Sequence, residues 1–221
     1  MNDPGQSLSR EQVRRFDRRV IEDWGVPGAV LMENAGRNAA DAIEEFLADR
    51  PVQPVAVVAG CGNNGGDGFV IARHLRKRGR EGVVFLVGDP ARMPPDAAVH
   101  YAILPHVGVA VRRCGGEALA SLSGQLADFG LVVDALGGTG IRGALRGDLA
   151  AAVEQINAAG RPVVAVDIPT GLDCDSGAAD GPAVRADMTV TFVARKRGFD
   201  APASADYTGK VVVADIGVPF P

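Results

Sequence analysis

Three short polar loops of this sequence carry the residue types that could do chemistry. They span residues 60–68, 134–143 and 167–173, and each combines glycines with carboxylate, amide or hydroxyl side chains. Carboxylates can transfer protons in a reaction. Together with amide and hydroxyl groups they also offer the oxygen atoms that hard cations prefer. The loops therefore indicate proton transfer, cation binding or both.

The segments before these loops predict where the loops must lie. Each loop follows a short, mainly valine run, at residues 55–59, 131–133 and 163–166. Such runs are typical of strands buried on both faces of a parallel sheet. Ligands of open α/β sheets bind beyond the carboxyl ends of the strands, so we expect one shared pocket. Asp134 and Asp167 each end a strand and are interpreted as facing it, although capping of the loop backbone is the alternative.

The first loop also matches a dinucleotide-binding fingerprint, Gly60-x-Gly62-x-x-Gly65. Asp67 follows closely and would place a carboxylate where a pyrophosphate normally rests on free backbone N–H groups. A simple pyrophosphate cradle is therefore disfavoured. An ordinary nucleotide-dependent oxidoreductase, with Asp89 on the ribose, is one alternative hypothesis. A non-catalytic nucleotide-binding or scaffold module is another.

Asn64, Asp134 and Thr170 could bind a cation together. No thiolate or imidazole accompanies them, so sodium, potassium, magnesium and calcium are the candidates. Simple hydrogen bonding within the loops is the alternative. Arg142 lies in a glycine-rich stretch that could bind an anion. Lys196 follows a further apolar run and could reach the same pocket.

The rest of the chain alternates between helical and strand patterns. Ser9 and Gln12 form a capping-box pattern that predicts a first helix, and Pro27 suits the start of a second over residues 28–47. From residue 55 onward, predicted strands and helices alternate, and the predicted helices include residues 68–77 and 117–129. This order predicts an α/β fold with a mostly parallel, doubly wound sheet, on which the two leading helices pack.

Composition narrows the class of protein. The 221 residues are 47% hydrophobic and 23% charged, which suits one packed domain over residues 1–221. A net charge of −4 disfavours a nucleic-acid binder that works by phosphate neutralisation. No apolar run reaches membrane-spanning length and the start has no leader pattern, so we expect a cytoplasmic protein. The three cysteines suggest neither a disulfide framework nor a zinc site.

Five ordered motifs together resemble the NAD(P)H-hydrate epimerase family, the YjeF amino-terminal domain. They are LMENAG at residues 31–36, GNNGGDG at 62–68, DALGGTG at 134–140, DIPTGLD at 167–173 and DIGVP at 215–219. The resemblance implies a Rossmann-like three-layer αβα domain, often a homodimer. It implies an isomerase that interconverts the R and S epimers of hydrated NADH or NADPH at nicotinamide C6, supplying a dehydratase that would here be a separate polypeptide.

The resemblance also implies a set of site residues. Potassium would be held by Asn64, Asp134 and Thr170. Asp167 is our candidate for the general acid and base. The hydrated dinucleotide would contact Asn63, Asn64, Gly65, Gly66, Asp67, Gly138, Thr139, Gly140, Ile141, Arg142, Gly143, Ala144 and Asp167. The sequence leaves open the choice between the two hydrates and the roles of Glu33, Asn34 and Lys196.

Overall fold

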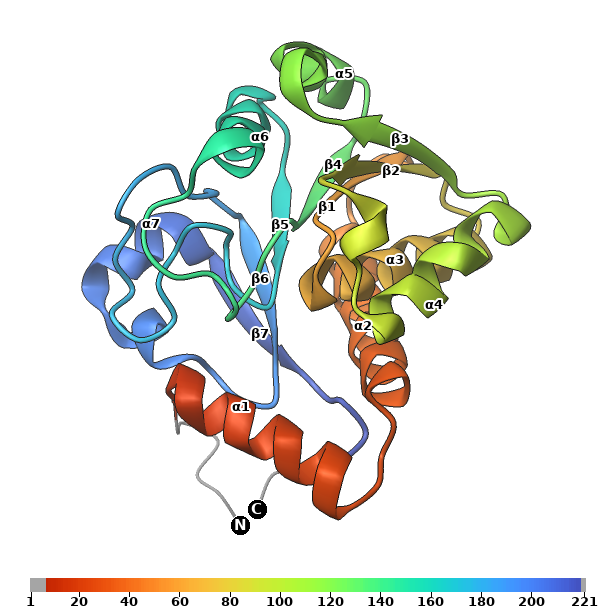
Figure 1. Cartoon of the computed structure of the whole chain (residues 1–221). Coiled ribbons are helices and arrows are strands. Elements are labelled where there is room, and N and C mark those ends of the chain that lie inside the picture. The colour runs from red at the N-terminus through yellow and green to blue at the C-terminus, as the bar shows by residue number, and fades with distance from the viewer. Residues whose placement is uncertain (1–6, 220–221) are drawn as a thin grey trace.

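The computed structural model of the chain describes residues 7–219, and within them the strands form one sheet (Figure 1). Its spatial order is β3-β2-β1-β4-β5-β6-β7, and every neighbouring pair is parallel. The strands are β1 (Val55–Ala59), β2 (Gly82–Val87), β3 (Ala110–Cys114), β4 (Leu131–Ala135), β5 (Val163–Val166), β6 (Met188–Phe192) and β7 (Lys210–Ala214). The predicted α/β fold with a doubly wound sheet is confirmed.

Helices cover both faces of this sheet. They are α1 (Arg10–Arg18), α2 (Gly28–Phe46), α3 (Asn63–Lys77), α4 (Pro95–Ile103), α5 (Leu122–Leu126), α6 (Gly147–Ala158) and α7 (Ala205–Thr208). Helices α2, α3 and α4 pack on one side, and α5 and α6 pack on the other (Figure 1). A π-helical turn, Arg19–Asp23, continues α1. Helix α1 itself lies beyond the carboxyl ends of β6 and β7 rather than on a face (Figure 1).

The predicted start of α1 is confirmed atom by atom. The Ser9 hydroxyl accepts the backbone N–H of Gln12, and the Gln12 side chain accepts the N–H of Ser9. This reciprocal capping satisfies two donors that a helix start leaves free. The cap fixes where α1 begins, and therefore which of its residues face the sheet.

Three helices differ from the expectation. Helix α1 does not pack on a face of the sheet, although both leading helices were expected to do so. Helix α3 begins at Asn63 instead of at residue 68, so the glycine-rich motif forms its first turns. Glycine disfavours helix in isolation, but packing overrides this preference. A side chain on Gly65 would overlap the carbonyl of Gly60, and one on Gly68 would press on Ala135. The helix predicted over 117–129 is instead a 3₁₀ turn, Gly116–Ser121, followed by the short α5.

The core lies on both faces of the strands. All five residues of β1 and of β4 are buried, as the apolar runs predicted. Alternate residues pack against different helices: Val57 joins the cluster under α2 and α3, whereas Val58 joins the one under α5 and α6. None of the helices in the described range is long and apolar enough to cross a membrane.

Candidate active site

A cavity of about 530 Å³ opens at the carboxyl ends of the strands. This size is ordinary for a small-molecule site. Its walls come from α1, the starts of α2 and α3, and the loops that follow β4, β5 and β6. Among the lining residues are Arg14, Asp17, Asn63, Asn64, Asp67, Gly138, Thr139, Gly140, Ile141, Asp167 and Lys196. The three polar loops therefore do share one pocket.

Asp167 is held at the cavity wall by its backbone and by two partners. Its φ of 67° lies in the left-handed region, which aspartate tolerates better than most residues. One carboxylate oxygen accepts the N–H of Thr139 at 2.9 Å, and the other lies 3.1 Å from Nζ of Lys196. The side chain keeps 14% of its surface exposed, so the carboxylate is fixed in direction and still reachable from the cavity.

Lys196 places a fully buried ammonium group behind Asp167. Its Nζ donates to the carbonyl of Phe192 at 2.8 Å and lies 3.4 Å from that of Ala194. A buried charge is tolerated only where such partners replace water. Val193, in the same turn, has φ of 68°, a rare and strained conformation for a β-branched residue. The strain indicates that this turn is held in place to enclose the ammonium group.

Two more carboxyl groups line the cavity beside this pair. Burial raises the pKa of Asp17 to about 6, with Asp167 adding to the shift and Lys196 opposing it. Burial also raises the pKa of Asp67 well above its usual range, and the charges of Asp167 and Asp17 act in the same direction. One ammonium cannot balance three neighbouring carboxylates, so the site retains protons at pH values where a free aspartate has lost them.

Sequence reasoning missed Asp17, although a signal was present. It sits on α1 four residues after Val13 and three before Val20, both of which are buried. Residues at those spacings share one helix face, so Asp17 belongs to the buried stripe rather than to the arginine-rich exposed face. An acidic residue within an apolar stripe is the feature that could have identified it.

Asp134 and Thr170 form a buried pair beneath the cavity floor. The Asp134 carboxylate accepts the hydroxyl of Thr170 at 2.7 Å, its N–H at 2.9 Å, and the N–H of Leu136 at 3.2 Å. The hydroxyl oxygen of Thr170 also accepts the N–H of Gly137, a cavity-lining residue. Asp134 is fully buried and absent from the cavity lining, so the interpretation that it faces the pocket is wrong and the capping alternative holds. Burial raises its pKa to about 6 despite these hydrogen bonds.

Asn64 is the third residue of the predicted cation set, and its amide is unsatisfied. Both its side-chain oxygen and its nitrogen are buried, and neither has a hydrogen-bond partner among residues 7–219. A buried amide without hydrogen bonds lowers the stability of the fold, so we expect a bound ion or water molecule to contact it. Asn64 lines the same cavity as Leu136 and Gly137, whose backbones contact Asp134 and Thr170.

The donor chemistry of this set suits a hard cation. Within residues 7–219, Asp134 forms no ion pair with Lys, Arg or His. The same residues contain no group of three or more His, Cys, Asp or Glu side chains arranged to hold a metal. One carboxylate with neutral oxygens favours a hard cation over zinc or another transition metal.

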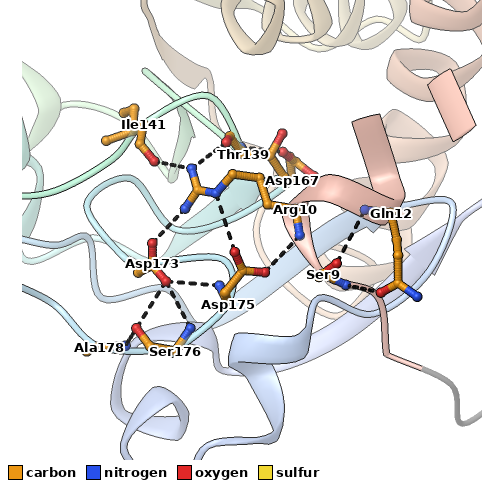
Figure 2. A network of polar contacts seen from close by, with 10 residues as sticks. All are labelled: Ser9, Arg10, Gln12, Thr139, Ile141, Asp167, Asp173, Asp175, Ser176 and Ala178. Carbon is orange, nitrogen blue, oxygen red and sulfur yellow. Dashed lines mark hydrogen bonds and ion pairs between the residues drawn. The ribbon is translucent and has the colours of Figure 1, made fainter. Parts of the chain in front are cut away.

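Arg10, which the sequence analysis also overlooked, ties α1 to two site loops (Figure 2). Its guanidinium donates to the carbonyls of Thr139, at 2.6 Å, and Ile141, and it pairs with Asp173 at 2.6 Å. Asp175 accepts the backbone N–H of Arg10. Asp173 in turn accepts N–H and hydroxyl groups of its own loop, including both donors of Ser176. We refer to these contacts as the Arg10 network.

The remaining predicted contact residues lie at different depths. Gly65 and Gly66 are buried behind the cavity wall, where they pack against Gly60 and Met32. Asn63 is exposed at the cavity mouth. The residues Arg142, Gly143 and Ala144 are exposed and lie outside the cavity lining. Their contact with a substrate stays a prediction.

Residues of the LMENAG motif hold helices together. Glu33 bonds to Nε2 of His74 at 2.8 Å and pairs with Arg73. Burial opposes ionisation of Glu33, but the His74 hydrogen bond and nearby positive charges outweigh it, so its pKa is lowered. Asn34 donates to the carbonyl of Ile216 and thereby links this motif to the last one. Neither side chain lines the cavity.

Asp89 does not stand where a ribose-binding acid is needed. It is exposed, caps the turn Pro90–Arg92 through the N–H of Ala91, and is absent from the cavity lining. The fingerprint glycines also serve packing, because a side chain on Gly60 would overlap the carbonyl of Leu136. The oxidoreductase alternative therefore loses the acidic residue that it would need for the ribose.

Comparison with known proteins agrees with this geometry. An NAD(P)H-hydrate epimerase of Pirellula staleyi is 45% identical over 95% of this chain and 92% of its own length. One from Rhodopirellula baltica is 42% identical over 96% and 85%. A bifunctional NAD(P)H-hydrate repair enzyme Nnr of Moorella thermoacetica is 41% identical, and this chain spans 40% of its length.

A solved structure and a family model also match this chain. The crystal structure of yeast ynu0, YNL200c, matches 98% of this chain and 90% of its own with a TM-score of 0.82 and 26% identity. Residues 28–198 match the family described as YjeF-related protein N-terminus. Since that match covers most of the chain and full-length relatives exceed 40% identity, the chain belongs to the YjeF-related protein N-terminus family.

Proposed function

We propose that this protein is an NAD(P)H-hydrate epimerase, an isomerase that interconverts the R and S epimers of hydrated NADH and NADPH at nicotinamide C6. One observation carries the proposal. Asp167 points its carboxylate into a cavity, braced by Lys196 and Thr139, in a chain that is 45% identical over nearly its full length to a protein of that name.

The reaction requires the protein to transfer protons and to position the nicotinamide ring. Inversion at C6 requires the hydroxyl to leave and water to return on the other face of the ring. The lone pair of the ring nitrogen can form a flat iminium ion as the C6–O bond breaks. A carboxylic acid protonates the departing oxygen, and a carboxylate receives a proton from the incoming water. Asp167, which lines the cavity, is our candidate for a carboxyl group of this kind, and the carboxylate-rich cavity would stabilise the positive ring.

The glycine-rich loops would hold the rest of the dinucleotide. Asn63 stands at the exposed mouth of the cavity, and Gly138 to Ile141 form an adjacent wall. A side chain on Gly138 would overlap the carboxylate of Asp167, so the loop needs glycine where it passes Asp167. These features support binding of the nicotinamide and its ribose next to Asp167.

Potassium is the cation we propose for Asn64, Asp134 and Thr170. The unsatisfied amide of Asn64 supports a cation here, as does the buried carboxylate of Asp134, which forms no ion pair within the described part of the chain. The cation would neutralise Asp134 and hold the loop at Gly137 against the start of α3, which fixes one wall of the cavity. Its role is therefore structural and electrostatic.

The decisive test follows a purified single epimer of hydrated NADH by chromatography. Addition of the protein should bring the epimers to equilibrium much faster than the spontaneous rate, with no change in the amount of NADH or NAD⁺. A scaffold module would leave the spontaneous rate unchanged. An oxidoreductase would show net hydride transfer with a carbonyl substrate instead. Either result would refute the proposal.

We propose that the chain acts with a dehydratase that consumes one epimer. Relatives of this family include bifunctional repair enzymes of which this chain spans about 40%, such as those of Moorella thermoacetica and Thermanaerovibrio acidaminovorans. A coupled assay with a dehydratase should convert both epimers completely when this protein is present. We also propose that the protein is a homodimer, which sedimentation velocity will measure.

A further inference from the structure

We propose that Asp17 is a second catalytic carboxyl group, acting on the face of the nicotinamide opposite to Asp167. This inference deepens the proposed epimerase function and rests on it. It assigns a role to α1, a helix that carries none of the five sequence motifs.

The two carboxyl groups come from different walls of one cavity. Asp167 follows β5 and belongs to the floor formed by the strand ends. Asp17 belongs to α1, which lies across those ends (Figure 1) and contributes Val13, Arg14 and Ile21 together with its continuation. Both groups are close enough to Lys196 to feel its charge. A flat ring that enters the cavity between α1 and the strand ends would present one face to each carboxyl group.

The stereochemistry requires such an arrangement. Asp167 is fixed by its backbone, by Thr139 and by Lys196, so it can serve only the face that lies against it. Departure of the hydroxyl from one face and arrival of water at the other need a proton donor and a proton acceptor on opposite sides. Otherwise the ring must turn over inside a walled cavity.

Atoms and charges balance in this scheme. The C6–O bond breaks with its electron pair on oxygen, which takes a proton from one carboxylic acid and becomes water. The lone pair of N1 forms the N1=C6 bond. A water molecule then attacks C6 from the other face, gives a proton to the second carboxylate, and the π electrons return to N1. The proton gained by one carboxyl group and lost by the other is restored through solvent.

The charges around Asp17 suit a group that must alternate between two protonation states. The charges of Lys196 and Asp167 act on Asp17, Asp17 in turn acts on Asp67, and Arg14 and Asp96 line the same cavity. Burial dominates this environment and raises the pKa of Asp17 to about 6. Both forms are therefore populated near neutral pH, which is what a group acting as acid in one direction and base in the other requires.

The experiment measures inversion at C6 separately from exchange of the C6 hydroxyl oxygen with water. A single epimer is incubated with enzyme in water enriched in heavy oxygen, and mass spectrometry after chromatography follows label in each epimer. For wild type, label should enter both epimers. For Asp17→Asn, inversion should fall at least about a hundredfold. Label should still enter one epimer with its configuration retained, because Asp167 continues to serve its own face. Asp167→Asn should show the mirror result.

Two further variants control for structure. Asp23→Asn removes the same charge from an exposed position on the continuation of α1 and should leave inversion and exchange unchanged. Asp17→Glu keeps a carboxyl group and should retain the limb of the pH–rate profile near 6 that Asp17→Asn loses. Thermal unfolding of each variant establishes that it is folded.

Three outcomes would overturn the inference. They are inversion by Asp17→Asn at the wild-type rate, equal loss of exchange in both epimers, or a pH–rate profile unchanged by Asp17→Asn. Failure of wild type to interconvert the epimers is a different result, because it would remove the proposed function and this inference together.

Discussion

Replacing Arg10 with glutamine tests whether α1 is anchored by the Arg10 network. The guanidinium is buried and donates to the carbonyls of Thr139 and Ile141 while pairing with Asp173. Glutamine is shorter and uncharged, so it can replace at most one of these contacts. The variant therefore leaves carbonyl groups and a carboxylate without their donor.

The expected loss follows from the number and exposure of those contacts. A hydrogen bond to a charged group is worth about 1.5–3 kcal/mol. The Asp173 side chain keeps 31% of its surface exposed, so water can hydrogen-bond to its carboxylate in the variant and reduces the loss of stability from this contact. We expect a net destabilisation of about 3 kcal/mol. For a domain of this size that corresponds to a fall in Tm of about 6–12 °C.

Circular dichroism during heating measures the change, and Arg15→Gln on the same helix is the control. Arg15 is exposed and its contact is a pair with exposed Glu11 at 3.4 Å. Such a pair is worth about 0.3–0.5 kcal/mol, so the control should shift Tm by less than about 2 °C. Equal shifts for the two variants would refute the anchoring role.

The pH dependence gives a second check. Burial raises the pKa of Asp173, but hydrogen bonds from Ser176 and Asp175 and the charge of Arg10 outweigh it, so the net pKa is lowered. A depressed carboxyl pKa stabilises the folded state above the ordinary value, about 4, and this contribution is lost as pH falls below it. The difference between wild type and Arg10→Gln should therefore narrow below about pH 4. A difference that stays constant down to pH 3 would contradict the assignment.

Three further predictions address the site itself. Asp167→Asn should lower kcat for epimer interconversion at least about a hundredfold in enzyme that is still folded, and it should also lower Tm because the buried Lys196 ammonium loses its carboxylate partner. A variant with wild-type turnover would exclude Asp167 as acid and base. Potassium chloride should raise the Tm of wild type more than lithium chloride does. Thr170→Val should abolish that increment, whereas Thr189→Val, which removes a buried hydroxyl bonded to Thr208, should keep it; an increment that survives in Thr170→Val would refute the cation site. Gly65→Ala should lower the urea midpoint sharply, because its methyl group would overlap the backbone of Gly60, and an unchanged midpoint would mean that α3 can shift away.

The strands and the shared pocket could be predicted because one physical constraint determines both. A parallel strand buried on both faces must be continuously apolar, so its end is marked where polar residues resume. That is how Asp134 and Asp167 were placed at strand ends, and why their loops were expected to meet. The capping box at Ser9 and Gln12 was equally local, since all of its atoms lie within four residues.

The start of α3 could not be predicted by the same means. Local propensity argues against a helix through Gly65, Gly66 and Gly68. These glycines are needed for tertiary packing, because the absence of side chains allows α3 to approach β1 and β4. Close packing between segments far apart in the sequence leaves no local pattern beyond the glycines themselves.

The α1 residues of the site were missed for a related reason. Arg10 and Asp17 lie in a segment rich in charge, which indicates an exposed helix on composition alone. Arg10 is nevertheless buried, because its partners come from loops more than a hundred residues away. The Asn64, Asp134 and Thr170 set, in contrast, could be proposed because its members were expected near the strand ends, and their joint binding of a cation stays a prediction.

The left-handed backbone at Asp167 restricts which acid this position can carry. Glycine, asparagine and aspartate adopt such a φ at low cost, whereas glutamate and alanine do not share the local hydrogen bonding that helps the shorter polar side chains. Asparagine is therefore the informative replacement, because it removes the charge and keeps the turn. Alanine would combine chemical loss with conformational strain. Aspartate therefore suits this position better than glutamate, because it tolerates the left-handed backbone and supplies the carboxyl group proposed for proton transfer.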